Sequence, residues 1–387
     1  MREEQRVPMT ALPVFTPNAL EPARLDALTF GRADVFDDLV SRLRSAARDG
    51  SRPHTLLIAA HGGGKTHTLH VAVNRALADE DTRARVLSVL LPESSLAIGS
   101  YLDLLTEIAG QIGGDLPDTA RALRRTRDPV GIEAAISAAA GDRMILLGLE
   151  NLDRVFDRIG EAGQGSLRAW VETSTAVLVF GTAPALFPGV SSRTHPWYGS
   201  FIVETLPELD VDECVELFAA AAGQRGKADV AEFAVSNTGR QRLSVIHRLI
   251  GGSPRLWHLL ADVADVAAVD EVTPVVHALL DQMAPYYQQR LWELPAGEQR
   301  LVVELARGRQ ARTVGDLADA VGVSNQSAAS ALGRLSDARW VSSSKAPDGD
   351  RRTSWYDVTD PLLRYWVQYR EGNPEPLARA IERLRGE

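Results

Sequence analysis

The chain has 387 residues, of which 45% are hydrophobic and 24% charged, enough for two or three compact domains, each with its own core. Its net charge of −9 excludes a protein that coats polyanions with its whole surface, so any contact with nucleic acid must be local. One cysteine excludes an internal disulfide and a cysteine-based metal site. The charged first residues and the short, proline-broken apolar segments lead us to expect a cytoplasmic protein without membrane contact.

The first strong signal along the chain is a glycine-rich turn at residues 59–66, AAHGGGKT. The apolar run before it, 54–60, predicts a buried parallel strand, and residues 66–79 after it have the apolar spacing of a helix. The turn matches the phosphate-binding pattern G-x-x-x-x-G-K-[ST] except for alanine at its first position. Alanine is tolerated there if the local backbone avoids a positive φ angle. A chance glycine-rich turn is the alternative.

In such a loop, backbone N–H groups wrap round phosphates, and the dipole of the following helix adds to the attraction. We expect Lys65 to reach the β- and γ-phosphates of ATP and the Thr66 hydroxyl to bind Mg²⁺. Only two other lysines, Lys227 and Lys345, occur among the 42 basic residues. We therefore predict a nucleotide site formed by Ala60, His61, Gly62, Gly63, Gly64, Lys65, Thr66 and His67.

A second apolar strand, within RMILLGLENLDRVF (143–156), ends in polar residues that can complete this site. It resembles the Walker B pattern of AAA+ ATPases. In that alignment Glu150 takes the Mg²⁺ position and Asn151 takes the position of the water-activating glutamate, and an amide cannot accept a proton from water. The other register puts Leu149 at the metal position and Glu150 at the base, which leaves Mg²⁺ without a carboxylate. An acidic strand end without chemistry is a further alternative, and Asp153 is either a substitute base or a helix cap.

Three more segments resemble parts of the AAA+ nucleotide site. A third strand, from about 175 to 183, ends in Thr182 at the place of the polar sensor 1 residue. The motif GGSPR resembles sensor 2 of the AAA+ lid, which implies that Arg255 points at the γ-phosphate. Segment 28–46 resembles the stretch before the P-loop, which implies that Gly31 and Arg32 lie near the adenine. Arg193 is either an arginine finger for a neighbouring subunit or a solvated loop residue.

The resemblance covers roughly residues 28–270 and is to AAA+ ATPases of the origin-recognition and archaeal-ATPase type, or to the related STAND switches. It implies an α/β fold with the parallel sheet of a P-loop NTPase and a helical lid. It also implies ATP and ADP as ligands, Mg²⁺ as cofactor and a possible homo-oligomer.

The C-terminal third shows three helical patterns followed by two strand-like runs about a Pro-Asp-Gly-Asp turn. This order resembles MarR-like winged helix-turn-helix domains, in which the third helix enters the major groove of double-stranded DNA and the wing meets phosphate. Residues 286–372 carry twelve basic and eleven acidic side chains, so they are far less acidic than the rest of the chain. Winged helices also serve as protein-interaction modules. The candidate DNA-binding residues are Asn325, Gln326 and Ser327 on the third helix, and Lys345, Arg351 and Arg352 on the wing.

These observations predict an ATP-binding ATPase with slow hydrolysis, whose nucleotide state controls DNA binding or assembly through the winged helix. One alternative is a STAND-like signalling or defence switch in which the winged helix is a protein-interaction latch. Another is a small-molecule kinase, which the winged domain and the lack of a substrate-base motif disfavour. The predicted organisation is an N-terminal extension (1–27), a nucleotide-binding domain (28–208), a helical lid (209–285), a winged helix domain (286–372) and a C-terminal helix (373–387).

Overall fold

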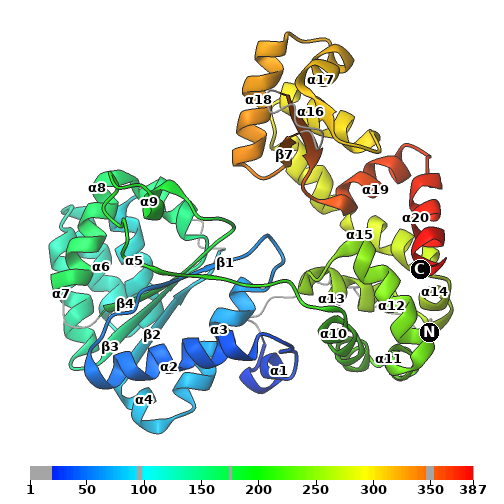
Figure 1. Cartoon of the computed structure of the whole chain (residues 1–387). Helices are drawn as coiled ribbons and strands as arrows, with labels where there is room; N and C mark the ends of the chain where they lie inside the picture. Colours follow the sequence, from blue (N-terminus) through cyan, green and yellow to red (C-terminus); the bar gives the residue numbers. More distant parts are fainter. Residues whose placement is uncertain (1–19, 94–97, 174–176, 346–352, 387) are drawn as a thin grey trace, which may run out of the picture. The chain divides into compact units, whose positions relative to one another are not determined.

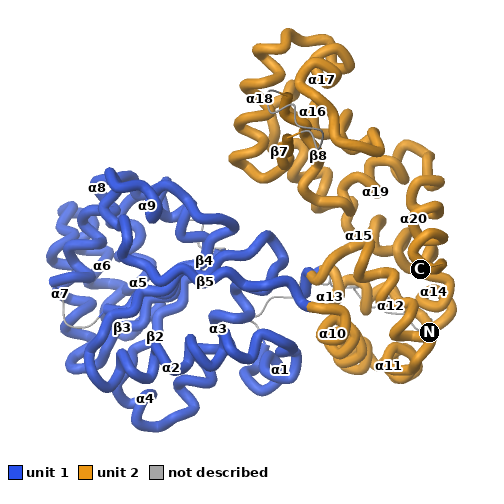
Figure 2. The backbone as a smooth tube through the Cα atoms, viewed as in Figure 1, with its two compact units in different colours: residues 1–209, 253–255 blue, residues 210–252, 256–387 orange. Residues whose placement is uncertain are grey.

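The structure is a computed structural model that describes residues 20–93, 98–173, 177–345 and 353–386. The chain forms two compact units (Figure 2). Unit 1 comprises Met1–Leu209 together with Ser253–Arg255, and unit 2 comprises Asp210–Gly252 and Leu256–Glu387. None of the described helices is long and apolar enough to cross a membrane. The finer domain boundaries that the sequence suggests remain predictions.

Unit 1 contains a five-stranded sheet in the order β2-β3-β4-β1-β5, in which every neighbouring pair is parallel (Figure 1). The three strands predicted from the sequence are confirmed as β1, β3 and β4, whereas β2 and β5 were not predicted. Because all five strands run the same way, their carboxyl ends meet at one edge of the sheet, where open α/β sheets bind ligands. The strands are β1 (Thr55–Ile58), β2 (Val86–Leu91), β3 (Met144–Leu149), β4 (Val177–Ala183) and β5 (Ile202–Thr205).

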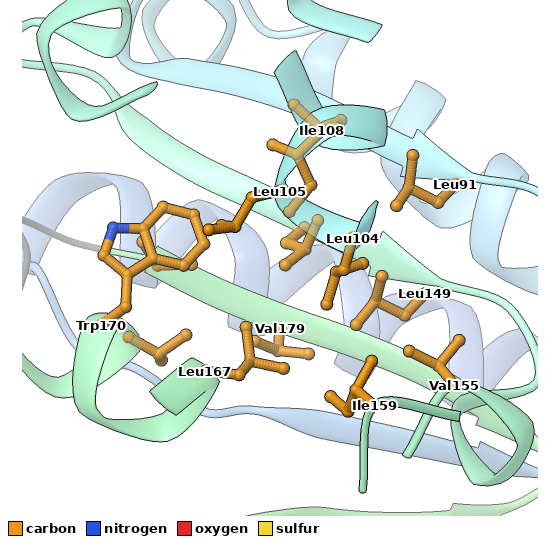
Figure 3. Packing of buried hydrophobic residues seen from close by; sticks show 14 of the residues in the cluster. Leu91, Leu104, Leu105, Ile108, Leu149, Val155, Ile159, Leu167, Trp170 and Val179 are labelled. Carbon is orange, nitrogen blue, oxygen red and sulfur yellow. The ribbon is translucent and has the colours of Figure 1, made fainter. Parts of the chain in front are cut away.

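Helices cover both faces of this sheet, which explains why its central strands are almost continuously apolar (Figure 1). Leu56 and Ile58 of β1 face one core, and Leu57 faces the other. Figure 3 shows the first core, where leucines of α5 and residues of α8 pack on the sheet. The helices of unit 1 are α1 (Pro22–Asp26), α2 (Ala33–Asp49), α3 (Lys65–Leu77), α4 (Glu80–Arg85), α5 (Tyr101–Ile112), α6 (Leu116–Arg125), α7 (Pro129–Ala140), α8 (Leu152–Thr173) and α9 (Pro188–Ser191).

The first part of unit 2 is helical. Helix α10 begins with a capping box, in which the side chains of Asp210 and Glu213 each accept a hydrogen bond from the other's backbone N–H. Trp257 is fully buried against Phe218, and its indole N–H donates to the carbonyl of Gly251 over 2.9 Å. These helices are α10 (Val211–Gln224), α11 (Ala228–Val235), α12 (Asn237–Ile250), α13 (Pro254–Val263), α14 (Val266–Glu271) and α15 (Thr273–Trp292).

The second part of unit 2 has the predicted order of a winged helix-turn-helix: three helices, then a hairpin. Gly322, with a φ of 73°, ends the second helix, and Ser324 caps the third. Two predicted DNA contacts, Arg351 and Arg352, lie outside the described residues. The two hairpin strands, β7 and β8, and the short strand β6 form an antiparallel sheet in the order β6-β8-β7. The elements are α16 (Ala296–Arg307), β6 (Arg312–Thr313), α17 (Val314–Val321), α18 (Asn325–Asp337), β7 (Val341–Lys345) and β8 (Ser354–Val358).

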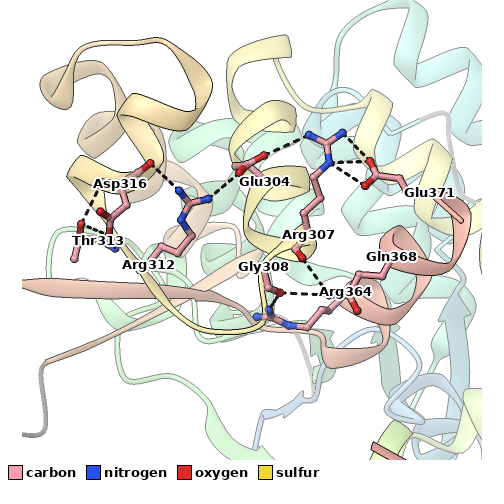
Figure 4. Close-up of polar contacts among 9 residues, drawn as sticks. All are labelled: Glu304, Arg307, Gly308, Arg312, Thr313, Asp316, Arg364, Gln368 and Glu371. Carbon is pink, nitrogen blue, oxygen red and sulfur yellow. Dashed lines mark hydrogen bonds and ion pairs between the residues drawn. The ribbon is translucent and has the colours of Figure 1, made fainter. Parts of the chain in front are cut away.

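Helix α19 (Pro361–Arg370) packs on the winged part and donates hydrogen bonds to backbone carbonyls at the end of α16 (Figure 4). The buried Gln368 donates from Nε2 to the carbonyls of Ala306 and Arg307, at 3.1 and 3.3 Å. Arg307 in turn forms an ion pair with Glu371 at 2.7 Å. The bonds from Gln368 satisfy backbone carbonyls that the end of a helix otherwise leaves without a partner. A last helix, α20 (Glu375–Gly386), follows.

Acid should weaken unit 1 through His54, which precedes β1. Burial lowers the pKa of His54 to about 4, and its Nδ1 accepts a hydrogen bond from the backbone of Val179 over 3.0 Å. The unfolded chain takes up this proton near pH 6.5, but the folded chain does so only near pH 4. The free energy of unfolding should therefore fall between these pH values, by up to about 3 kcal/mol in total.

The measurement is urea unfolding at pH 7 and pH 5, for the wild type and for His54→Gln. The glutamine oxygen can still accept the Val179 bond but does not titrate, so the variant should lose less stability on acidification than the wild type. An equal loss in both proteins would show that other groups carry the acid sensitivity. His67, whose pKa is also lowered to about 4 by burial, contributes equally to both proteins.

Candidate nucleotide site

The turn between β1 and α3 has the backbone of a phosphate-binding loop. Gly62 and Gly64 have φ angles of 81° and 89°, which side-chain-bearing residues rarely adopt. A Cβ atom on Gly63 would lie 2.7 Å from the Cβ of Ala59, so the loop also needs glycine for space. Ala59 itself is not among the described residues with positive φ, and alanine therefore fits the first position of the pattern. The loop leads into the N-terminus of α3, where N–H groups and the helix dipole favour an anion.

Lys65 lies inside this loop. Its Nζ donates to the carbonyls of Ala59 and Ala60, at 2.7 and 3.1 Å, and the side chain is buried. Burial lowers the pKa of Lys65 to about 8, although the charges of Glu93, Asp153 and Glu150 act in the opposite direction. A buried ammonium whose partners are neutral carbonyls gains a stronger partner when phosphate oxygens enter the loop.

Thr66 and Glu150 come together although they lie 84 residues apart in sequence. The Thr66 hydroxyl donates to Oε2 of Glu150 over 2.7 Å. The second carboxylate oxygen, Oε1, is buried without a hydrogen-bond partner, and His70 Nε2 lies 3.7 Å from it. A hydroxyl beside a carboxylate with an unsatisfied oxygen is a donor set that suits Mg²⁺. The geometry favours the register with Glu150 at the metal position, since Leu149 lies in the apolar core.

Asn151 and Thr182 meet at the ends of β3 and β4. The backbone N–H of Asn151 donates to the Thr182 hydroxyl over 3.0 Å, and Asn151 has a left-handed backbone with a φ of 49°. The amide Nδ2 of Asn151 is buried without a hydrogen-bond partner. Asp153 lies in the first turn of α8, where burial raises its pKa. The structure thus gathers Glu150, Asn151 and Thr182 at the edge of the sheet that carries the P-loop.

Arg32 contacts the P-loop directly. It has a left-handed backbone, with a φ of 56°, at the start of α2, as does the preceding Gly31, with a φ of 64°. Its Nη1 donates to the carbonyl of Gly63 over 2.8 Å, and its Nη2 donates to the carbonyl of Pro207. This contact joins the loop to the segment that follows β5.

The two loop histidines differ in their surroundings. His67 lies 2.8 Å from the hydroxyl of Thr29, and burial lowers its pKa to about 4, so its ring is uncharged at neutral pH. His61 is exposed in the turn.

Segment Ser253–Arg255 also contacts the loop. The Ser253 hydroxyl and the Arg255 backbone N–H both donate to the carbonyl of Gly62, at 3.2 and 3.3 Å. A Cβ atom on Gly62 would lie 2.9 Å from the Cβ of Arg255. Arg193, by contrast, is exposed after α9, and no hydrogen bond or ion pair among the described residues joins it to the loop.

Sequence reasoning missed two charged residues beside this site, Glu93 and Arg154. Glu93 follows β2, and its Oε1 lies 3.6 Å from Nη1 of Arg154. Both side chains line a pocket together with Glu150 and Asn151. The signal that could have found them is the short apolar run at 86–91, which was not recognised as a strand beside β3.

The candidate DNA-binding residues lie on the winged part of unit 2. Asn325, Gln326 and Ser327 are exposed in the first turn of α18. Lys345, exposed at the end of β7, donates from Nζ to the Ser354 hydroxyl over 2.8 Å. Arg334, later on α18, pairs with the buried Glu298 of α16 at 2.7 Å, which ties the third helix to the first.

No family model matches the sequence, and no curated protein matches it. Solved structures do match. The Walker-type ATPase PABY2304 of Pyrococcus abyssi has a TM-score of 0.59 at 12% identity, with 88% of this chain and 96% of that chain covered. The Aeropyrum pernix Orc1 protein in complex with DNA gives a TM-score of 0.49 at 13% identity, covering 93% and 98%. Cdc6p from Pyrobaculum aerophilum gives a TM-score of 0.45 at 14% identity, covering 95% and 98%.

At 12% identity the match to the Pyrococcus protein shows the fold alone. The match to the Pyrococcus protein spans nearly the whole of both chains, and the P-loop lies between a strand and a helix of a parallel sheet. The chain therefore shares the fold of this Pyrococcus Walker-type ATPase, an α/β fold with a parallel sheet and a P-loop.

Proposed function

We propose that this protein binds ATP with Mg²⁺ at the P-loop and hydrolyses it slowly, and that its nucleotide state controls DNA binding or assembly through the winged helix. The observation that carries the proposal is the convergence of Lys65, Thr66 and Glu150 on one turn. A buried cation lies within the loop, and a hydroxyl and a carboxylate lie beside it. Phosphate and a divalent cation are the ligands that such a set of groups recognises.

The loop residues have distinct tasks in this function. The backbone N–H groups at the start of α3 hold the phosphates, and Lys65 exchanges its bonds to the Ala59 and Ala60 carbonyls for bonds to phosphate oxygens. Thr66 and Glu150 would hold Mg²⁺, which would supply positive charge to offset that of the phosphates. Asn151 orients water but cannot take its proton, so turnover is slower than with a glutamate at this position.

Coupling to DNA is tested by measuring duplex affinity and oligomer size of the whole protein with ATP, with ADP and without nucleotide. We expect ATP to raise both, because assembly aligns several wings on one duplex. Replacing Lys345, Arg351 and Arg352 by alanine should weaken binding to unrelated sequences and flatten the salt dependence by about one unit of slope per lost phosphate contact. If neither the duplex affinity nor the oligomer size changes with the nucleotide, the proposed coupling is wrong.

A second candidate function is a signalling switch in which the winged helix binds a protein surface instead of DNA. Uncharged polar groups dominate the exposed start of α18, and the charge of Arg334 is paired with Glu298. A helix that reads DNA usually offers arginine or lysine to bases or phosphate. Absence of any DNA affinity at low salt, with ATP present, would favour this second function.

A further inference from the structure

The proposed site lacks a base at the position where the sequence pattern places one. Asn151 occupies that position, and its amide can orient a water molecule but cannot accept a proton from it. Its Nδ2 is nevertheless buried at the site without a hydrogen-bond partner. A donor group in this state is suited to hold an oxygen atom close to the end of β3. Another group must then receive the proton.

Glu93 lies at the matching place on the neighbouring strand. Strands β2 and β3 are parallel, with Leu91 opposite Leu149 in the register. The pairing continues just beyond the strands, where the backbone N–H of Glu150 donates to the Leu91 carbonyl over 3.2 Å. Glu93 stands two residues after Leu91, and Asn151 stands two residues after Leu149. The chain therefore carries a carboxylate just after β2 and an amide just after β3, at the same edge of the sheet.

Two further observations place the Glu93 carboxylate at the reaction site. Glu93, Glu150 and Asn151 line the same pocket, together with Arg154 and Arg158 of α8. Of the carboxylates that act on the buried ammonium of Lys65, Glu93 contributes most, ahead of Asp153 and Glu150. The Glu93 carboxylate therefore lies near enough to Lys65 for its charge to favour the protonated lysine.

Arg154 pairs with the Glu93 carboxylate without enclosing it. The two side chains lie 3.6 Å apart, and they are 59% and 55% exposed, respectively. An exposed ion pair is weak, so the carboxylate can leave Arg154 and turn towards a bound water. The exposure also gives the carboxylate contact with bulk solvent, to which a captured proton can return.

We propose that Glu93 is the general base of ATP hydrolysis in this protein, with the Asn151 amide orienting the attacking water. This inference rests on the proposed function. The water oxygen forms a bond to the γ-phosphorus while the bond from that phosphorus to the β,γ-bridging oxygen breaks. Glu93 takes one proton of the water, and the bridging oxygen leaves with ADP. The protonated Glu93 then releases its proton to solvent, which restores the carboxylate.

Asp153 is the competing carboxylate, but it is less open to a bound water. It lies in the first turn of α8, where burial raises its pKa although backbone N–H groups of Asp153 and Arg154 act in the opposite direction. Its Oδ1 is buried without a hydrogen-bond partner, whereas the Glu93 side chain is exposed. Asp153 also does not line the pocket that Glu93 shares with Asn151.

The test compares Glu93→Gln with the matched variant Asp153→Asn in steady-state hydrolysis of ATP with Mg²⁺. We expect Glu93→Gln to lower kcat by roughly 100-fold or more, which is the usual contribution of a general base. Asp153→Asn should change kcat by less than about threefold, because Asp153 does not line the pocket that Glu93 shares with Asn151. The double variant Glu93→Gln/Asn151→Glu should recover most of the lost rate, since it returns a carboxylate to the β3 position.

Binding measurements separate this inference from the proposed function. A fluorescent ATP analogue should bind Glu93→Gln and the wild type equally, whereas ADP with aluminium fluoride, a mimic of the transferring phosphoryl group, should bind the variant more weakly. A large loss of kcat in Asp153→Asn with none in Glu93→Gln would assign the base to Asp153 and overturn the inference. Unchanged turnover in Glu93→Gln, or ATP binding without any turnover by the wild type, would also overturn it. Failure of the wild type to bind ATP would instead refute the proposed function.

Discussion

Lys65→Ala should abolish measurable ATP binding while leaving the protein folded. The ammonium of Lys65 is the cation inside the loop, and each charge-assisted bond that it makes to phosphate is stronger than its present bonds to the Ala59 and Ala60 carbonyls. We expect a fall in affinity of roughly 100-fold or more, equal to at least about 3 kcal/mol. The fold should survive, because the variant also removes a buried charge whose desolvation is unfavourable. Titration with a fluorescent ATP analogue measures the effect, and circular dichroism checks the fold.

Lys345→Ala is the matched control, because it removes one of the other two lysines from an exposed site on the wing. It should leave ATP affinity unchanged. Equal affinity of folded Lys65→Ala and wild type would refute the assignment of the loop as a phosphate site.

The pH dependence of binding gives a second check on Lys65. Its pKa without ligand is about 8, so above that pH the lysine is increasingly neutral before ATP arrives. Bound phosphates favour the charged form and raise the pKa, so binding takes up a proton at high pH. The ATP affinity of the wild type should therefore fall as pH rises from 8 to 9, by up to tenfold. Lys65→Arg, which retains a cation above pH 9, should lose this dependence.

The sequence predicts those parts of the site whose residues are contiguous in the chain or stand at the end of an apolar run. The P-loop is contiguous, so its strand, glycines and Lys65 can be recognised without tertiary information. Glu150 and Thr182 could be located because each follows an apolar run, and parallel strands bring their ends to one edge. The order of the winged part was likewise visible, because its helices and hairpin have their own caps and turns.

The remaining contacts depend on features that no local pattern reveals. Glu93 follows a run whose partner strand lies more than 50 residues away, and recognising its place requires the register of β2 on β3. Arg32, which donates to the carbonyl of Gly63, has a left-handed backbone, a conformation that arginine rarely adopts. The pairing of Arg334 with Glu298 joins two helices whose relative placement only the packed domain determines.

Glu150→Gln should weaken ATP binding in the presence of Mg²⁺ by roughly 10- to 100-fold, and hydrolysis by a similar factor or more. The glutamine keeps the size of the side chain and an oxygen for the Thr66 hydroxyl. It removes the negative charge that a divalent cation prefers. Binding of ATP without Mg²⁺ should change little, since the loop N–H groups and Lys65 remain. Affinity measured with Mg²⁺ and with a chelator separates the two contributions.

Glu93→Gln is the informative comparison for this prediction, because it removes a neighbouring carboxylate of the same pocket. If Glu150 holds the metal and Glu93 receives the proton, only Glu150→Gln lowers the gain in ATP affinity that Mg²⁺ provides, while both variants lower turnover. If only Glu93→Gln lowers the gain in ATP affinity from Mg²⁺, the metal lies at Glu93. If Glu150→Gln lowers turnover but leaves that gain unchanged, the other register is supported, with Glu150 as the base. The unsatisfied Oε1 of Glu150 argues for the first outcome, because a buried carboxylate oxygen without a hydrogen bond is costly unless a cation completes its coordination.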